Sequence, residues 1–169
     1  MAAIMIAVPT ITAPVVADEY AIGLGQDDVL NQTDTQSVAF VIEYHASPFF
    51  SGNISDYSIG VAGQVDGDSD VWLGIGVYAL WSVRFSNWFF EGSFMPGYYD
   101  RGSDGTPLGG NIQFRDLVGV GYKISDTQRV SLAIDHKSNA GLEDKNQAVK
   151  RLSCVTLNAS KIARHSTGC

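Results

Sequence analysis

Seven segments of the chain alternate between bulky apolar side chains and small or polar ones, with a period of two residues. In an extended strand, residues two apart share a face, so the pattern predicts strands with one bulky face and one small or polar face. Beyond residue 17, no stretch reaches the roughly 18 consecutive apolar residues that a membrane-spanning helix needs. We therefore predict an all-β protein with strands at 19–25, 37–44, 56–65, 70–81, 88–99, 113–124 and 130–138.

Two classes of β-protein fit this alternation, and they differ in which face they bury. A soluble barrel buries the bulky face, whereas a membrane barrel turns it to lipid and packs small and polar groups inside. Strands of about ten residues favour the membrane barrel, as do recurrent glycines on the small face, which suit a narrow filled lumen. Aromatic residues at strand ends point the same way: Tyr44, Trp81, Trp88, Tyr98 and Tyr122.

The predicted fold is thus an antiparallel up-and-down outer-membrane β-barrel, and such barrels have even strand numbers that begin at eight. The alternative is a soluble secreted barrel that binds an apolar ligand in its lumen. That function requires an apolar lining, which the small and polar face does not supply.

The charge balance and the cysteines exclude several kinds of function. A net charge of −7 argues against nucleic-acid binding, which requires a basic surface. Cys154 and Cys169 both lie near the end of the chain, so the main body has no disulfide scaffold, cysteine nucleophile or thiolate zinc site. We expect no metal or cofactor.

Two further features receive structural interpretations. The acidic run at 66–70 lacks the later glycine and glutamate of a calcium loop, so we interpret it as an outward acidic loop. His45 and His165 have no evident partners in the sequence, and we expect both at the surface.

Residues 1–17 resemble a signal peptide. The stretch is apolar and uncharged, and Val15 and Ala17 fit signal-peptidase cleavage after Ala17. The usual positively charged start is missing, which suggests a truncated or misplaced beginning. We expect an exported protein whose barrel domain occupies residues 18–146.

The last alternating segment ends with two residues that carry chemistry. Val130, Leu132 and Ile134 share a face with His136 and Ser138, so a base and a nucleophile follow an apolar stripe. A strand end that simply turns polar where it meets water gives the same pattern. The strand alone does not separate these two interpretations.

An eighth strand is not recognisable in the sequence. Residues 147–160, where it belongs, contain strand-compatible residues but no clean alternation, and a polar tail follows. We expect residues 147–169 to be an aberrant tail, which would leave the barrel with two unpaired edges.

The run His136-Lys137-Ser138-Asn139-Ala140-Gly141 resembles the signature of the PagL-type lipid A 3-O-deacylases, also called acyloxyacyl hydrolases. The resemblance covers roughly residues 18–146. It implies an outer-membrane eight-stranded barrel that hydrolyses the ester of the 3-position acyl chain of lipid A, or lipopolysaccharide. It also implies that Ser138 is the nucleophile, that His136 is the general base, and that Asn139 and Gly141 stabilise the oxyanion.

The chain departs from this family at its third catalytic position. The family places a glutamate twelve residues after the serine, where this chain has Lys150. Glu143 and Asp144 are near in sequence, but we interpret them as loop charges. For the sequence as it stands we therefore expect impaired activity, and a non-catalytic structural or adhesive barrel is the alternative function.

The loss of one nucleotide after the Asn146 codon would explain both the missing eighth strand and the lysine at position 150. Codons permitted for residues 147–161 allow a shifted reading that has a glutamate at position 150, an alternating eighth strand and a terminal phenylalanine. We predict that nucleotide sequencing across the Asn146 codon will reveal this shift. An intact reading frame at that point would contradict the hypothesis.

Overall fold

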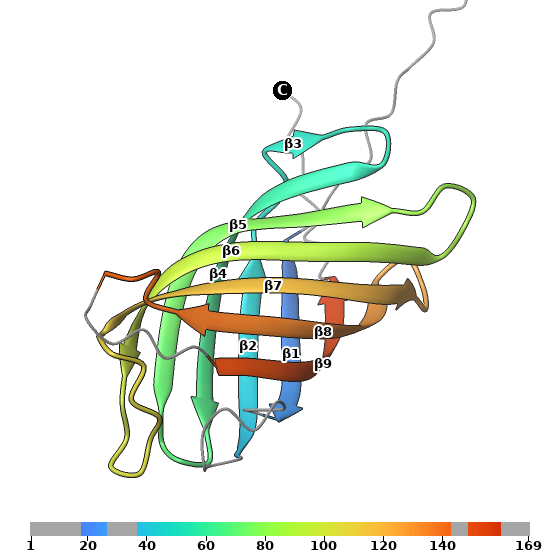
Figure 1. The fold of residues 1–169 in the computed structure, drawn as a ribbon. Coiled ribbons are helices and arrows are strands. Elements are labelled where there is room, and N and C mark those ends of the chain that lie inside the picture. The colour runs from blue at the N-terminus through green and yellow to red at the C-terminus, as the bar shows by residue number, and fades with distance from the viewer. Residues whose placement is uncertain (1–17, 27–36, 143–148, 160–169) are drawn as a thin grey trace, which may run out of the picture.

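The computed structural model describes residues 18–26, 37–142 and 149–159, which form nine strands and no helix (Figure 1). No helix long and apolar enough to cross a membrane occurs in these residues. The predicted signal peptide lies outside the described part. The strands are β1 Glu19–Gln26, β2 Val38–His45, β3 Phe50–Ser51, β4 Ser55–Asp66, β5 Val71–Ser82, β6 Trp88–Asp100, β7 Ile112–Lys123, β8 Gln128–Ser138 and β9 Val149–Ala159.

The strands form one antiparallel sheet that closes on itself. Each long strand pairs with the next along the chain, and β9 pairs with β1 to complete the ring. The short β3 pairs with the start of β4 and lies outside the ring (Figure 1). The seven predicted strands are confirmed to within two residues at each end, and the eight long strands give the predicted barrel.

The expectation of two unpaired edges is wrong. β9 forms from 149–159, within the segment that shows no clean alternation, and it pairs with β8 on one side and β1 on the other. The barrel therefore extends beyond the expected boundary at residue 146. Backbone groups in hydrocarbon must find partners within the protein, and β9 provides them for both neighbouring strands.

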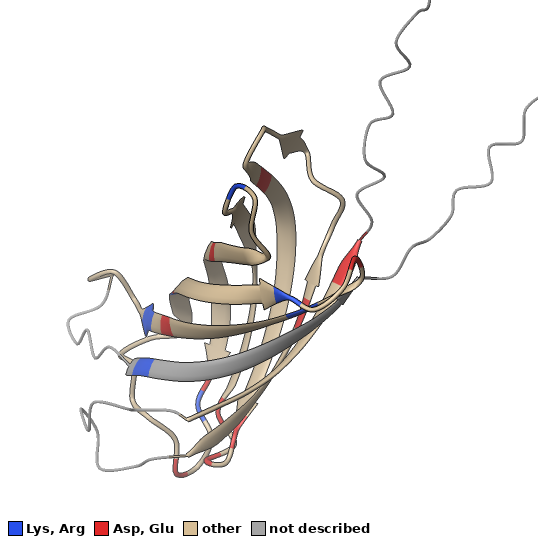
Figure 2. Ribbon diagram, turned by 90° about the vertical axis from the view of Figure 1, so that its right-hand side faces the viewer, with Lys and Arg blue, Asp and Glu red and all other residues tan. Residues whose placement is uncertain are grey.

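Burial along the strands is the inverse of that in a soluble barrel. Outward side chains such as Leu24, Val38 and Val118 are 62–67% exposed, whereas inward Ala21 and Ala133 are 1% exposed. Long stretches of strand also carry no charged residue (Figure 2). An apolar band of this extent indicates a surface that faces lipid, which decides against the soluble alternative.

The lumen contains larger side chains than the sequence pattern suggested. Trp72, Phe89 and Met95 are almost fully buried inside the ring. The inward glycines make room for them. A Cβ on Gly121, which pairs with Phe89 across the sheet, would lie 2.1 Å from the Phe89 ring. The lumen is therefore filled by large side chains set against glycines.

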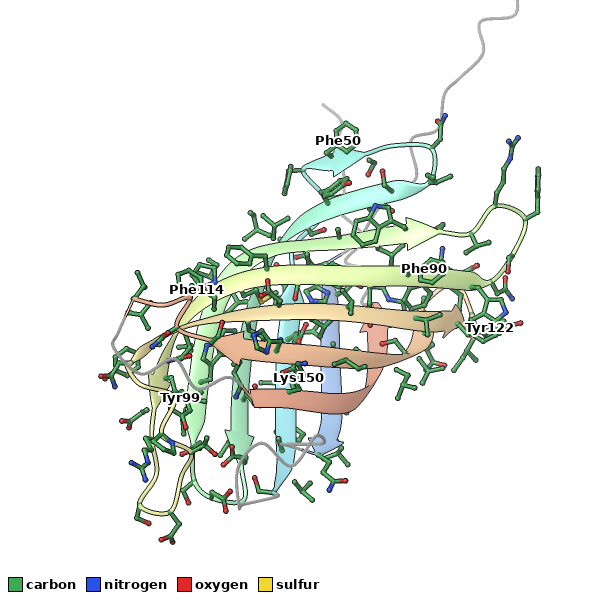
Figure 3. All side chains as sticks on the ribbon, viewed as in Figure 1. Phe50, Phe90, Tyr99, Phe114, Tyr122 and Lys150 are labelled. Carbon is green, nitrogen blue, oxygen red and sulfur yellow. The ribbon has the colours of Figure 1, made fainter. Side chains whose placement is uncertain are left out.

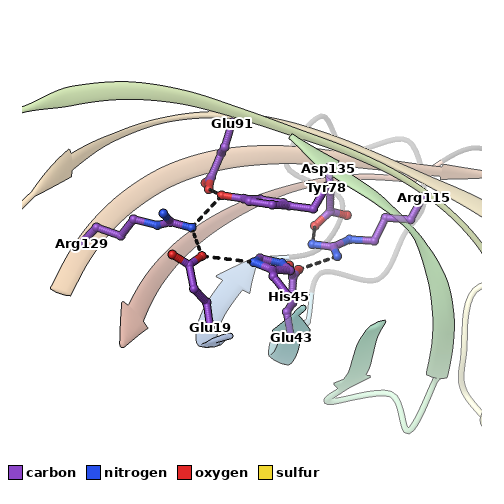
Figure 4. Close-up of polar contacts among 8 residues, drawn as sticks. All are labelled: Glu19, Glu43, His45, Tyr78, Glu91, Arg115, Arg129 and Asp135. Carbon is purple, nitrogen blue, oxygen red and sulfur yellow. Dashed lines mark hydrogen bonds and ion pairs between the residues drawn. The ribbon is translucent and has the colours of Figure 1, made fainter. Parts of the chain in front are cut away.

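A buried ion cluster crosses the lumen (Figure 4). Arg115 on β7 donates to Glu43 on β2 over 2.6 Å and to Asp135 on β8 over 3.4 Å, and these three side chains are at most 4% exposed. His45 lies 3.0 Å from Glu43 and stacks on Tyr78 at a ring separation of 3.7 Å. The expectation that His45 is a surface residue is wrong, and His165 lies outside the described residues.

A second polar group lies beside this cluster. Arg129 forms an ion pair with Glu19 and donates a hydrogen bond to the Tyr78 hydroxyl over 3.1 Å. Tyr78 in turn donates to Glu91 over 2.8 Å. In the two groups together, side chains from six strands (β1, β2, β5, β6, β7 and β8) are held together across the lumen (Figure 4).

The acidic run at 66–70 is built into the fold. Asp70 is 4% exposed, and its carboxylate accepts hydrogen bonds from the backbone of Gly102 and Thr106 and from the Tyr99 hydroxyl. Asp66 accepts from the backbone of Asp70. The interpretation as an outward acidic loop is therefore wrong for these two carboxylates, because Asp70 attaches the β4–β5 turn to the β6–β7 loop and Asp66 accepts hydrogen bonds from the backbone of its own turn.

Replacing Arg115 with methionine should destabilise the barrel strongly, because it leaves Glu43 and Asp135 buried without their shared cation. We expect a loss of about 3–5 kcal/mol in the free energy of unfolding, measured by urea titration in detergent micelles. Arg84→Met is the matched control, since Arg84 is exposed. Equal stability of the two variants would contradict this role for Arg115.

Candidate active site

His136 and Ser138 lie at the C-terminal end of β8, on its outward face. Leu132 and Ile134, which precede them on that face, are each 52% exposed, while the intervening Asp135 and Lys137 point into the lumen and are buried. Both candidate residues are half-buried. The structure therefore brings together the predicted base and nucleophile on the apolar outer surface.

The length of the strand connections indicates which end of the barrel carries this pair. By the strand bounds, residues 27–37, 67–70, 101–111 and 139–148 connect strands at the end where β8 finishes, whereas residues 46–54, 83–87 and 124–127 connect them at the other end. The three longest connections therefore share the end where β8 finishes. In barrels of this kind, the longer loops are extracellular and the short turns are periplasmic. His136 and Ser138 thus lie near the extracellular rim.

A tight turn follows Ser138. Asn139 is fully buried, and its Oδ1 accepts a hydrogen bond from the Gly141 backbone N–H over 2.9 Å. Its carbonyl accepts from Leu142 over 3.0 Å. Ala140 and Gly141 both have positive φ angles, of 53° and 77°. In this structure the Gly141 N–H is engaged with Asn139, so an oxyanion role for Gly141 requires that bond to open.

Aromatic side chains border Ser138 on the neighbouring strand. Phe114 on β7 pairs with Ser138 across the sheet, and its ring stacks on Phe94 of β6 at 5.8 Å and 14°. Phe94 is 51% exposed on the outer surface. Phe114 lies at the same end of the barrel as the β8 terminus (Figure 3). The serine therefore adjoins an apolar surface that faces lipid.

Two charged residues flank His136 across the sheet. Lys150 on β9 (labelled in Figure 3) pairs with His136. The position at which the family that the sequence resembles has a glutamate therefore lies beside the histidine. Asp116 pairs with His136 from β7, and it is exposed on the outward face. Asp116 is the acidic member of an otherwise apolar outward series on β7, which is the signal in the sequence that could have identified it.

His136 Nδ1 is buried and has no hydrogen-bond partner among the residues that the structure describes. Glu143 and Asp144 lie outside those residues.

No group of three or more metal-binding side chains occurs in the described part of the chain. A pocket lined by Glu19, Lys123 and Arg129 opens at the start of β8 and so belongs to the opposite end of the barrel.

Replacing Gly141 with alanine tests the geometry of the turn. A Cβ there would contact nothing within 4 Å, but the φ of 77° disfavours any residue with a side chain. We expect a loss of about 1–2 kcal/mol in unfolding free energy by urea titration. In the control Gly63→Ala, the new Cβ would meet only ordinary contacts of 3.6 and 3.8 Å. A turn that tolerates alanine as well as position 63 does would refute the assigned conformation.

Comparison with solved structures confirms the fold. The crystal structure of the outer-membrane enzyme PagL matches with a TM-score of 0.67 at 16% identity, covering 84% of this chain and 99% of that one. A de novo designed transmembrane β-barrel matches with a TM-score of 0.57 at 12% identity, covering 86% and 96%. Neisserial surface protein A has a TM-score of 0.50 at 12% identity, covering 85% and 96%.

Comparison of the sequence assigns the family. No curated protein matches the chain. The sequence profile of the family described as lipid A 3-O-deacylase (PagL) matches residues 35–154, a span that contains His136, Ser138 and Lys150. Together with its barrel neighbours, this match locates the protein in the bacterial outer membrane. The chain belongs to the PagL family of lipid A 3-O-deacylases.

Proposed function

We propose that this protein is a serine esterase that removes the 3-O-linked acyl chain of lipid A, with Ser138 as nucleophile and His136 as general base. The observation that carries the proposal is the position of the pair at the end of β8, on the outward face and near the extracellular rim. Lipid A lies in the outer leaflet, so its ester reaches such a site from the membrane without entering the lumen.

The proposed reaction is hydrolysis through an acyl-enzyme. Ser138 Oγ attacks the ester carbonyl carbon while His136 takes the hydroxyl proton. The tetrahedral intermediate then releases the sugar 3-hydroxyl, which receives that proton from His136. Water, deprotonated by His136, next attacks the acyl-serine, and the fatty acid leaves as Ser138 regains its proton.

The surroundings of Ser138 suit a lipid substrate. The stacked rings of Phe114 and Phe94 provide an apolar surface beside the serine, along which an acyl chain can lie. Asn139 and Gly141 remain the candidates for stabilising the oxyanion. Backbone and amide N–H groups perform that role in acyl transfer when they point at the developing charge.

Lys150 favours two outcomes: weak esterase activity, or the alternative function of a non-catalytic structural or adhesive barrel. A lysine ammonium has no acceptor to offer His136, and loss of the orienting carboxylate lowers the rate about ten-thousandfold in a well-studied triad. If the candidate site is inactive because of Lys150, the chain is a structural or adhesive barrel that has lost the reaction. The frameshift hypothesis is the third explanation, because it replaces Lys150 with glutamate.

Mass spectrometry of lipid A from cells that express the protein tests the esterase. We expect a species lacking one 3-hydroxyacyl chain with the wild-type protein, and none with Ser138→Ala or His136→Ala. Ser131→Ala is the control, because Ser131 lies on the same strand but points into the lumen and is 3% exposed. Unchanged lipid A from folded wild-type protein, or product from Ser138→Ala, would contradict the proposal and favour the non-catalytic barrel.

A further inference from the structure

Asp116 is a carboxylate in an unusual place. The other outward residues of β7 are apolar or aromatic: Ile112, Phe114, Val118, Val120 and Tyr122. Asp116 lies among them and is exposed on the surface that faces lipid. Ionisable residues in such a position are costly, and their retention marks a functional role with a specific partner.

The sheet register identifies that partner. Asp116 lies directly opposite His136 in the β7–β8 ladder, and both side chains point outward. Directly opposed residues of an antiparallel pair have Cβ atoms about 4.5–5.5 Å apart. An aspartate side chain spans that separation after a change of rotamer, whereas Asp135 next to His136 in sequence points into the lumen and contacts Arg115.

His136 requires such a carboxylate. If its Nε2 takes the proton of Ser138, Nδ1 carries a proton that needs an acceptor to fix the tautomer and the ring orientation. Nδ1 is buried and without a partner among the described residues. On the β9 side, Lys150 can only donate.

We propose that Asp116 is the positioning residue that orients His136 in this chain, on the opposite side of the histidine from the family's glutamate position. Asp116 accepts the Nδ1 proton and stabilises the imidazolium that forms when Ser138 is deprotonated. This inference rests on the proposed function of His136 and Ser138. It predicts residual activity in the presence of Lys150.

A double-mutant cycle separates this role from a structural one. The four proteins are the wild type, Asp116→Asn, Lys150→Glu and the double variant, each assayed in detergent for release of fatty acid from lipid A. We expect Asp116→Asn to lower kcat by about 100-fold or more while KM changes little, since a triad aspartate replaced by asparagine loses up to about ten-thousandfold. In the Lys150→Glu background the loss should be below about tenfold, because the new glutamate supplies the second acceptor.

A structural defect would lower kcat by the same factor in both backgrounds, and that result would overturn the proposal. So would an Asp116→Asn variant with wild-type kcat, or an inactive wild type beside an active Lys150→Glu variant. Asp100→Asn is the matched control, since Asp100 is also an exposed aspartate, at the end of β6. Its kcat should equal that of the wild type.

Histidine tautomers provide a readout that does not need activity. In ¹⁵N spectra of the barrel in micelles, the His136 signal, assigned with a His136→Asn variant, should show a protonated Nδ1 that is lost in Asp116→Asn. An unchanged tautomer would overturn the role of Asp116. If all four proteins are inactive while the Asp116-dependent tautomer is present, the proposed esterase fails and the pairing with Asp116 stands.

Discussion

Closure of the backbone hydrogen-bond ring is the constraint on which the rest of this structure depends. In hydrocarbon no water satisfies an exposed strand edge, so every spanning strand needs two neighbours. β9 meets that need by pairing with both β8 and β1. Once the ring is closed, the period of two sends apolar side chains to lipid and leaves the lumen to glycine, large rings and the Arg115 ion cluster.

The same geometry places the candidate site. Parity puts His136 and Ser138 outward, and the register brings Phe114, Asp116 and Lys150 beside them from the two adjoining strands. The site is thus a patch of outer wall and not a cavity. A substrate that stays in the membrane suits such a patch, which is why family membership and the position of the pair support one another.

The alternation of side chains along the sequence predicted those features of the structure that depend on alternation alone. The seven alternating segments, their outward faces and the position of Ser138 and His136 all follow from the period of two. β9 did not, because its pairing is required by the backbone of β1 and β8 and not by its own alternation. The burial of His45, Asp70 and Trp72 was not predicted, since it depends on contacts with Tyr78 of β5, Tyr99 of β6 and Gln113 of β7, which are far away in the sequence. The role proposed for Asp116 could not be predicted, because it depends on the cross-strand pairing with His136, which the sequence does not show.

The central claim is that Ser138 is a nucleophile activated by His136 at the outer surface. Treating intact cells with a membrane-impermeant alkyl fluorophosphonate tests it most directly, because an activated serine forms an O–P bond and expels fluoride. We predict that mass spectrometry will find the phosphonyl group on the peptide containing Ser138, and that His136→Ala will abolish this labelling. Absence of label on a correctly folded wild-type barrel, or equal labelling without the histidine, would contradict the account.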